Sequence, residues 1–328
     1  MQMQRIGLIV NPMAGRDIRR LVARASLTSS TDKLQAARRV VAGAAQAGKV
    51  EVVLNDDWEG MGRALQAEYP DVIRLLAPDQ SHPTSVSGRT QVWTQALEAD
   101  GVSVIMVIGG DGTQRNATEA MPEIPLLALA GGTNNVACWL GDETVAGYAA
   151  AMWALEKPAL EDTGTQVKVI HVQTEREAQT LALIDVAFVR QRYTGALAVW
   201  SASDVSQLLL AVADPARPGL SNVGGMLTRL TPEEDQGLEV GLTPSGASGR
   251  SVPAVLAPGL MAVFSVQYVE RIALGKSIFW KAEEGGSLAL DGERTVVMAP
   301  GETVSLTIRR DGPWFLHPGR ILEKVAGH

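Results

Sequence analysis

The chain has 328 residues, of which 46% are hydrophobic and 20% are charged, the balance of a soluble globular protein with a sizeable core and enough length for two domains. Its formal net charge of -7 argues against nucleic acid as the main partner, and no charge-free run of about 18 apolar residues is present to span a membrane. The single cysteine, Cys138, excludes an internal disulfide framework and favours a reducing compartment, so we expect a cytoplasmic protein.

Residues 1–157 alternate between strand-like and helix-like patterns. The apolar run RIGLIV, residues 5–10, is typical of a buried parallel strand, and residues 32–48 follow with helical spacing that closes on Gly48. The alternation continues with expected strands at 50–54, 71–77, 102–108 and 125–130 and expected helices at 58–69, 89–101, from Thr113 onward and at 143–157. Strands that alternate with helices predict βαβ units, and therefore a parallel sheet with right-handed crossovers.

Residues 158–311 have a different character. Strand-like runs between turn-rich connections predict strands at 166–175, 180–191, 237–244, 260–274, 286–298 and 302–310, with one helix expected at 205–213. Residues 312–328 leave this pattern, and we expect them to pack elsewhere. The predicted fold class is α/β: a parallel-sheet, Rossmann-like N-terminal domain over 1–157, followed by a mostly antiparallel, β-sandwich-like domain over 158–311.

Three glycine-containing loops follow expected strands of the first domain. They are NPMAGR at 11–16, GGDGT at 109–113 and GGTNN at 131–135. Parallel strands present such loops at one edge of the sheet, where ligands bind; glycines let the backbone approach a ligand, and N–H groups at a helix start suit a phosphate. Each loop taken alone also fits an ordinary turn. Three of them at one predicted edge favour a phosphate-binding site, although neither a Walker A motif nor Gly-x-Gly-x-x-Gly is present.

Asp111 is the residue of these loops with the clearest chemistry. An acid at the end of a strand, beside phosphate-binding amides, is well placed to accept a proton from an attacking hydroxyl or to hold a metal ion. The four histidines, His82, His171, His317 and His328, are scattered without metal-ligand spacing, so no structural zinc site is expected.

In this order and spacing, NPMAGR, GGDGT and GGTNN resemble the superfamily of NAD kinases, diacylglycerol kinases and sphingosine kinases. Residues 84–113 are similar to the lead-in of the ATP-NAD/AcoX kinase branch; the resemblance covers residues 1–155 well and the second half more weakly, through LDGER at 290–294. It implies an α/β domain, a β-sandwich-like domain, an ATP site in the cleft between them, a tail that returns to the first domain, and a homodimer or larger homo-oligomer. It also implies transfer of the γ-phosphoryl group of ATP to a hydroxyl, with Mg²⁺ as a cofactor.

The resemblance assigns roles to residues of both domains. Asp111 would be the general base, and the nucleotide phosphates would lie against Asn11, Gly15, Arg16, Gly109, Gly110, Gly112, Thr113, Gly132, Thr133 and Asn134. In the second domain, Asp185, Asp291 and Glu293 would lie near the substrate or a metal ion. The LDGER residues resemble an acidic element of the lipid kinases, but a hairpin turn between two strands explains them equally well.

Two departures from the family pattern bear on the substrate. NAD kinases carry an Asn-Glu pair where this chain has Ile184 and Asp185, and an isoleucine cannot make the hydrogen bonds of an asparagine, which weakens NAD as the acceptor. Arg89, in Gly88-Arg89-Thr90, stands where the lead-in usually has an acid.

The acceptor therefore stays open between NAD(H) and a small hydroxylated metabolite. A lipid kinase of the diacylglycerol type, or a catalytically silent nucleotide-binding sensor, is the alternative. An NAD-dependent oxidoreductase also fits the α/β pattern but lacks the expected glycine fingerprint.

Overall fold

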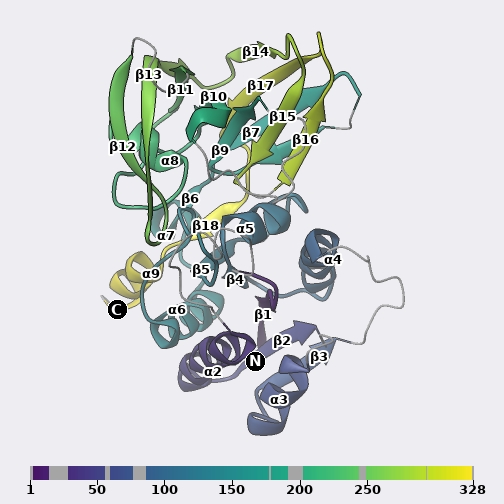
Figure 1. Cartoon of the computed structure of the whole chain (residues 1–328). Coiled ribbons are helices and arrows are strands. Elements are labelled where there is room, and N and C mark those ends of the chain that lie inside the picture. The colour runs from purple at the N-terminus through teal and green to yellow at the C-terminus, as the bar shows by residue number, and fades with distance from the viewer. Residues whose placement is uncertain are drawn as a thin grey trace.

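The molecule has an α/β part that holds both ends of the chain and a β-rich part stacked on it (Figure 1). The computed structural model describes residues 3–14, 29–55, 60–76, 86–176, 179–190, 202–243, 249–292 and 294–326. A seven-stranded sheet forms the centre of the α/β part, in the order β3-β2-β1-β4-β5-β18-β6. Its first five strands pair in parallel, which together with the antiparallel β-rich part confirms the predicted α/β fold class. The strands are β1 (Gln4–Val10), β2 (Val50–Asn55), β3 (Ile73–Leu76), β4 (Ile105–Gly109), β5 (Leu126–Ala130), β6 (Gly164–Gln166) and β18 (Trp314–Leu316).

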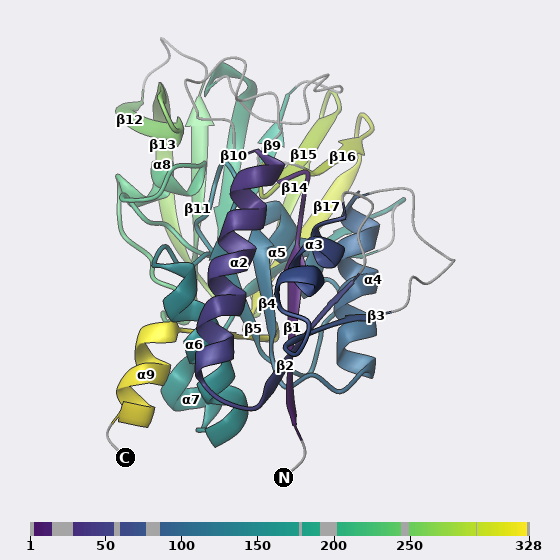
Figure 2. The same ribbon diagram turned by 90° about the horizontal axis from the view of Figure 1, so that it is seen from below.

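Helices cover both faces of this sheet (Figure 2). Ile6, Leu8 and Val10 of β1 pack in a core closed by α2, α3 and α6, whereas Ile9 packs in the core beneath α4 and α5. Because successive side chains of a strand point to opposite faces, a strand buried on both faces needs apolar residues throughout. The helices are α2 (Ser30–Gln46), α3 (Met61–Glu68), α4 (Val86–Ala99), α5 (Asp111–Thr118), α6 (Glu143–Glu156), α7 (Leu160–Thr163) and α9 (Pro318–Ala326).

Helices α2 and α6 pack backbone against backbone through one glycine from each. A Cβ atom added to Gly43 would lie 2.0 Å from the carbonyl oxygen of Thr144, and one added to Gly147 would lie 1.9 Å from that of Val40. Neither position has room for a methyl group, so the glycines set the distance between the two helices.

Two antiparallel sheets pack face to face in the β-rich part. One has the order β12-β13-β11-β10-β9-β15-β16 and the other the order β14-β17-β7-β8. Residues of β9, β10 and β15 share one core with residues of β7, β14 and β17, as in a β-sandwich. Within the residues described, no helix is both long and apolar enough to cross a membrane. The elements are β7 (Val169–Thr174), β8 (Thr180–Ala182), β9 (Asp185–Val189), η1 (Ala202–Asp204), β10 (Val205–Leu210), α8 (Ser221–Gly225), β11 (Gln236–Thr243), β12 (Arg250–Ala257), β13 (Leu260–Ala273), β14 (Ser277–Lys281), β15 (Gly286–Leu290), β16 (Arg294–Met298) and β17 (Thr303–Arg309).

The helix expected at 205–213 is wrong, because this segment contains strand β10. The strand pairs antiparallel with β9 on one side and β11 on the other. Leu208 and Leu210 contribute to one core and Leu209 to the other, so both faces of the strand are buried. A short strand of this kind is a continuous apolar run, and such a run has no periodicity that separates a strand from a helix.

The end of the chain returns to the first sheet. Strand β18 pairs antiparallel with β6 and, at Phe315 and Leu126, lies parallel to β5, while α9 packs against α6. The chain therefore crosses between the two parts before β7 and again after β17. The domain boundaries at 1–157 and 158–311 stay a prediction; β6 lies within the first sheet.

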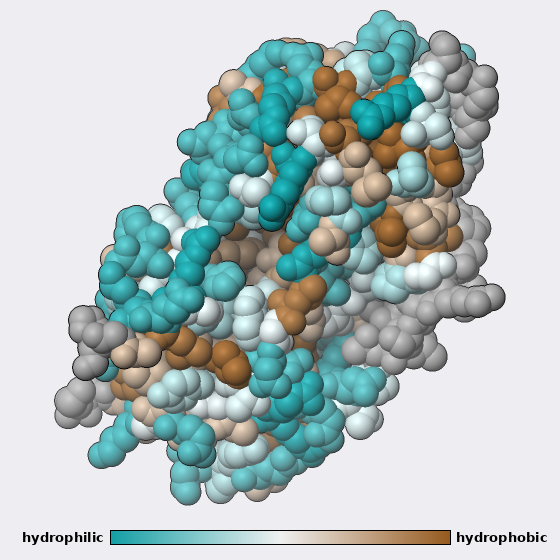
Figure 3. Space-filling view, turned by 90° about the vertical axis from the view of Figure 1, so that its left-hand side faces the viewer, coloured by the Kyte–Doolittle hydropathy of each residue, from teal (hydrophilic) through white to brown (hydrophobic). Residues whose placement is uncertain are grey.

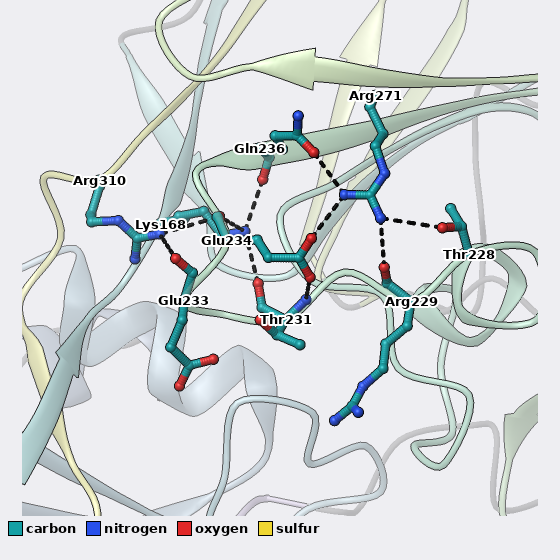
Figure 4. A network of polar contacts seen from close by, with 9 residues as sticks. All are labelled: Lys168, Thr228, Arg229, Thr231, Glu233, Glu234, Gln236, Arg271 and Arg310. Atoms are coloured by element: carbon teal, nitrogen blue, oxygen red, sulfur yellow. Dashed lines mark hydrogen bonds and ion pairs between the residues drawn. The ribbon is translucent and has the colours of Figure 1, made fainter.

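Lys168, at the first crossing, binds the acidic loop 231–236 (Figure 4). Its Nζ donates to the backbone carbonyl oxygens of Thr231, Glu234 and Gln236 at 3.1, 2.9 and 2.8 Å. The residue is 2% exposed. Because an ammonium group has three N–H donors, these carbonyls engage all of them.

Two arginines bind the same loop from the β-rich part. Arg310, at the second crossing, donates to the backbone carbonyls of Glu233 and Glu234 at 3.0 and 3.2 Å and pairs with the carboxylate of Asp235 at 2.8 Å. Arg271 of β13 donates to the carboxylate of Glu234 at 2.8 Å. The 231–236 loop is thus bound by residues of both chain crossings.

The Lys168 contact predicts a pH dependence of stability. Burial lowers the pKa of the Lys168 ammonium group from 10.5 to about 8, and Arg310 acts in the same direction against three nearby carboxylates. Between these values the unfolded chain holds the proton and the folded chain does not, so the free energy of unfolding rises with pH. We expect urea titrations of the wild type to show this rise from about pH 8 to 10, and those of Lys168→Met to lack it.

Lys168→Met will be less stable at every pH, because three carbonyl oxygens lose their donor. The slope against pH, rather than the absolute stability, is therefore the test. Parallel curves for the two proteins would contradict the lowered pKa.

The glycine contact between α2 and α6 predicts a loss of stability in Gly147→Ala. Alanine favours a helix over glycine by about 1 kcal/mol. We nevertheless expect the melting temperature to fall, because the added methyl group must push the helices apart and overpacking costs about 1–3 kcal/mol. Val145→Ala is the control, since Val145 is 40% exposed on the same helix. A melting temperature of Gly147→Ala at or above that of the wild type would rule out the close contact.

Candidate active site

The order of the parallel strands opens a crevice at one edge of the sheet. Strand β1 lies between β2 and β4, and the helices described next after these strands, α2 after β1 and α5 after β4, cover opposite faces. Connections that diverge in this way leave the carboxyl ends of two neighbouring strands uncovered, and open α/β sheets bind ligands there. Asn11 directly follows β1, and Gly110 and Asp111 directly follow β4.

The glycine loops after β4 and β5 lie against each other. Gly131 donates its N–H to the carbonyl oxygen of Gly109 at 3.0 Å. A Cβ atom on Gly110 would lie 2.9 Å from the carbonyl oxygen of Asn134, and one on Gly132 would lie 2.4 Å from the Cα of Gly110. The glycines are therefore needed to bring the two loops together, apart from any contact with a ligand.

Asn135 holds the loop after β5 in shape. Its side-chain oxygen accepts the N–H groups of Gly131 and Gly132 at 3.2 and 3.0 Å, and its amide donates to the carbonyl oxygen of Gly132 at 3.0 Å. Thr133, in the same loop, is 6% exposed. No role was predicted for Asn135, although the doubled asparagine of GGTNN marks this position.

Asn11 joins the loop after β1 to the loop after β4. Its amide donates to the hydroxyl of Thr113 at 2.8 Å, and both residues are buried. The carboxyl ends of β1, β4 and β5 thus come together at one edge, as the parallel sheet requires. Gly15 and Arg16, also expected there, lie outside the described residues.

Asp111 is the first residue of α5, directly ahead of Gly112, and is 5% exposed. Its carboxylate accepts the backbone N–H groups of Val136 and Ala137 at 3.0 and 2.9 Å, and its own N–H donates to the carbonyl oxygen of Asn134 at 3.1 Å. A carboxylate oxygen has two acceptor positions, so these bonds do not exhaust its capacity. The result is a negative charge held in one orientation at the end of β4.

Asp291 is a second buried carboxylate with backbone partners. It begins the turn between β15 and β16, with a positive φ of 49°. Its carboxylate accepts the N–H groups of Leu183, Ile184 and Asp185 at 3.0, 2.7 and 3.2 Å. Burial raises the pKa of the Asp291 carboxyl group, against the Arg115 guanidinium and these N–H groups, which lower it.

Arg115 of α5 reaches the turn that carries Asp291. It is 3% exposed and donates to the carbonyl oxygen of Leu290 at 3.2 Å, immediately before Asp291. Asp111, Asp185 and Asp291 line one cavity of about 10 Å³, room for about one water molecule. Asp291 therefore lies in a hairpin turn and also borders the crevice. Arg115 was not predicted as a site residue, although its place four residues after Asp111 puts both on one side of α5.

The acidic residues fit a metal ion only together with other ligands. Within the described ranges, no three side chains of His, Cys, Asp or Glu are close enough to hold a metal ion. Mg²⁺ in phosphoryl-transfer sites usually keeps several waters and binds one or two carboxylates plus the substrate phosphates. Asp111 and Asp185 border the same cavity and suit such a partial donor set. Glu293 lies outside the described residues.

A larger cavity, of about 210 Å³, lies beside the Asp111 loop and between the two parts of the molecule. Val136 borders both this cavity and the small one. Apolar side chains, including Trp139, Ile184 and Phe315, form most of its wall. The side of the molecule in Figure 3 is hollowed, with apolar side chains inside and hydrophilic ones around them. A wall of this kind suits a ligand with a carbon body and few polar contacts.

Cys138 lies in the wall of the larger cavity. Burial raises the pKa of its thiol well above the usual value, and the charge of Asp111 acts in the same direction, while Gln114 and Arg217 oppose both. The thiol is therefore protonated at neutral pH and packs as a small apolar group rather than acting as a nucleophile.

A parallel sheet of this order, with glycine loops and an aspartate at its switch point and a β-sandwich across the crevice, defines the fold of the NAD kinases and diacylglycerol kinases. The family model of the ATP-NAD kinase N-terminal domain matches residues 6–149, and that of the acetoin catabolism protein X C-terminal domain matches residues 168–311. Acetoin catabolism protein X of Cupriavidus necator is 30% identical over 316 residues, which cover 92% of this chain and 87% of that protein. The chain belongs to the acetoin catabolism protein X family.

Two solved structures have the same fold. Yeast NADH kinase complexed with NADH is 12% identical, with a TM-score of 0.50 over 99% of this chain and 88% of that one. A putative diacylglycerol kinase from Bacillus anthracis str. Sterne is 14% identical, with a TM-score of 0.52 over 97% of this chain and 98% of that one. Family and fold together support a kinase-type function.

The contacts of Asp291 predict different effects of two substitutions. Asp291→Ala leaves three buried N–H groups without an acceptor and places alanine at a positive φ, so we expect a loss of about 3 kcal/mol or more in the free energy of unfolding. Asp291→Asn keeps an acceptor oxygen, and asparagine tolerates this backbone conformation, so we expect a loss of about 1 kcal/mol. Urea titrations compare the two. Equal losses would mean that the negative charge, and not the acceptor oxygen, carries the contribution.

Proposed function

We propose that the protein is an ATP-dependent kinase that transfers the γ-phosphoryl group of ATP to the hydroxyl group of a small acceptor. The fixed position of the Asp111 carboxylate carries this proposal: it lies at the carboxyl edge of the sheet, between two glycine loops, and borders a cavity shared with the β-rich part. Enzymatic phosphoryl transfer depends mainly on positioning and on charge stabilisation, and a fixed carboxylate at such an edge supports both.

The glycine loops fit a polyphosphate. The N–H groups in the first turn of a helix have no acceptor within the helix, and α5 begins at the loop that follows β4. We assign the triphosphate to Gly109, Gly110, Gly112, Thr113, Gly132, Thr133 and Asn134, with Asn11, Gly15 and Arg16 on the side of β1. ATP supplies the phosphoryl group, and Mg²⁺ offsets the charge of the phosphates.

Asp111 accepts the proton of the acceptor hydroxyl in this proposal. The hydroxyl oxygen forms a bond to the γ-phosphorus, the bond from that phosphorus to ADP breaks, and the hydroxyl proton passes to the Asp111 carboxylate. Because Val136 and Ala137 already hold the carboxylate by their N–H groups, it needs no reorientation when the hydroxyl arrives. Asp185 and Glu293 remain assigned to the vicinity of the substrate or metal.

The acceptor fits the larger cavity best as a small hydroxylated metabolite. Ile184, which lines this cavity, stands where NAD kinases carry an asparagine and offers no hydrogen bond. The Cupriavidus necator relative is named for acetoin catabolism, and acetoin is a small hydroxy ketone. NAD(H) is the second candidate, because the yeast neighbour is an NADH kinase. A homo-oligomeric, cytoplasmic enzyme stays a prediction.

Asp111→Asn tests the proposed base. Removal of a general base typically costs about 10²–10⁴-fold in kcat. We expect a loss of this size with ATP binding retained, measured by thermal shift, because the backbone groups that meet the phosphates remain. The asparagine amide will face a backbone N–H, so the melting temperature of the free variant must be recorded beside its activity. Asp71→Asn, at an exposed site, is the control. Full turnover in Asp111→Asn would exclude the role of base.

A panel of acceptors with labelled ATP and Mg²⁺ tests the reaction itself. NAD, NADH, acetoin, glycerol and a diacylglycerol represent the candidate classes. ATP binding without phosphorylation of any acceptor would overturn the kinase proposal and favour a catalytically silent nucleotide sensor.

A further inference from the structure

The charged residues around the larger cavity leave it with an excess of positive charge. Among the residues that the structure describes, Lys168, Arg217 and Arg320 line it, against one carboxylate, that of Glu233. Burial lowers the pKa of the His317 imidazole, and Arg320 acts in the same direction, so His317 adds no charge at neutral pH. The chain as a whole has a formal net charge of -7, so this local excess is unlike the rest of the protein. It favours an anionic ligand.

Two of the three cations have partners within the protein. Lys168 is held by the carbonyl groups of the 231–236 loop, which engage its three donors. Arg320 donates to the carbonyl oxygen of Gly164 and the hydroxyl of Thr165 at 3.1 and 3.3 Å, and to the carboxylate of Glu233 at 3.1 Å. Contacts within the protein therefore account for the presence of Lys168 and Arg320 in the cavity wall.

Within the part of the chain that the structure describes, the contacts of Arg217 do not engage all of its donors. Its Nη1 atom is buried and has no hydrogen-bond partner among the residues described. Its ion pair with Asp214 spans 3.9 Å from Nε to the carboxylate oxygen, which is beyond hydrogen-bonding distance. Because an unpaired buried donor is costly, folded proteins rarely keep one unless a ligand or another group pairs with it.

The backbone that carries Arg217 is fixed on several sides. Its N–H donates to the carbonyl oxygen of Asp214 at 3.3 Å, and its carbonyl oxygen accepts the amide of Asn222 at 3.0 Å. The side-chain oxygen of Asn222 in turn accepts the N–H of Val255 in β12 at 2.9 Å. The guanidinium is thus presented from a braced loop, the pre-organisation expected of a ligand contact.

Arg217 also lies near the Asp111 site. Cys138, in the cavity wall, is close enough to both charges that Asp111 raises the pKa of its thiol and Arg217 lowers it. Val136 borders both the larger cavity and the small cavity at Asp111. The two cavities adjoin at Val136, so a ligand whose anionic group lies against Arg217 would extend from the larger cavity toward the one that Asp111 lines.

We propose that the larger cavity binds a compact organic anion that also carries a hydroxyl group, and that Arg217 holds its carboxylate or phosphate. The planar fork of a guanidinium matches both groups. Ile184, Phe315 and the other apolar residues of the wall pack the carbon chain. The proposal names the acceptor class of the proposed kinase; its binding step is independent of that function, and only the transfer step rests on it.

Matched probes test the binding step without catalysis. Thermal-shift titrations of the full chain compare 3-hydroxybutyrate with 1,3-butanediol, which has the same carbon number and the same secondary hydroxyl but no charge. Glycerol 3-phosphate is compared with glycerol in the same way. We expect an anion, and neither uncharged alcohol, to raise the melting temperature of the wild type, and the tighter-binding anion identifies carboxylate or phosphate. Arg217→Gln should weaken that affinity by about 10–100-fold, the loss typical of a charged hydrogen bond.

Two further variants separate charge from structure. Arg217→Lys keeps the charge without the fork and should recover part of the affinity. Arg229→Gln removes an exposed arginine close along the chain and should bind the anion as the wild type does. Equal anion affinity in Arg217→Gln and the wild type overturns the proposal, whatever the stability of the variant. Equal affinity for an anion and its uncharged match, or a loss of ATP affinity in place of anion affinity, also overturns it.

A kinase assay distinguishes this proposal from the proposed function. Phosphorylation of uncharged alcohols alone, with a KM that Arg217→Gln leaves unchanged, would overturn the anion site and leave the kinase function standing. Anion binding that depends on Arg217, without transfer to any acceptor, would support the site and overturn the kinase function.

Discussion

The N–H groups of Val136 and Ala137 hold the carboxylate of Asp111, and the other contacts of the site depend on this interaction. It ties the loop after β4 to the loop after β5, while Asn11 and Thr113 tie the loop after β1 to the same place. Hydrogen bonds to a charged group contribute about 1.5–3 kcal/mol each, more than bonds between neutral groups. The acid proposed to take the proton is therefore also the group that holds together the loops after β4 and β5.

The β-rich part repeats this construction. Asp291 accepts the N–H groups of residues 183–185 as Asp111 accepts those of residues 136–137. In both segments the backbone N–H groups turn toward a buried carboxylate, while Val136, Ala137, Leu183 and Ile184 line the larger cavity. Two buried carboxylates thus fix two walls of one cavity. A substitution at either carboxylate would therefore remove the hydrogen bonds of a wall segment as well as a charge, which would couple the proposed reaction site to the proposed acceptor site.

Local pattern predicted most of the fold and part of the site. The alternation of strand-like and helix-like patterns over residues 1–157 predicted the parallel sheet. The glycine loops predicted a site at one edge of that sheet, because parallel strands end at the same edge. The helix expected at 205–213 was wrong, because a short strand buried on both faces has no period of its own. Arg115 bonds to a residue 175 positions away and Lys168 to one 68 positions away, and no local pattern encodes such separations. The cavity between the two parts, and Arg217 in its wall, could not be predicted for the same reason.

In the acceptor site proposed for this cavity, discrimination between ligands would depend on which polar groups of the wall each ligand leaves without a hydrogen bond. An apolar wall separates ligands weakly, since one methylene group changes binding by about 1–3 kcal/mol. The Arg217 guanidinium would separate them more strongly, because a neutral alcohol leaves its buried Nη1 donor without a charged partner. Ile184 would disfavour an amide-bearing ligand, because it cannot give such a ligand the hydrogen bond that an asparagine would give. In the proposed site the wall would then select the length of the carbon chain, and the charge of Arg217 would favour an anionic ligand over a neutral one.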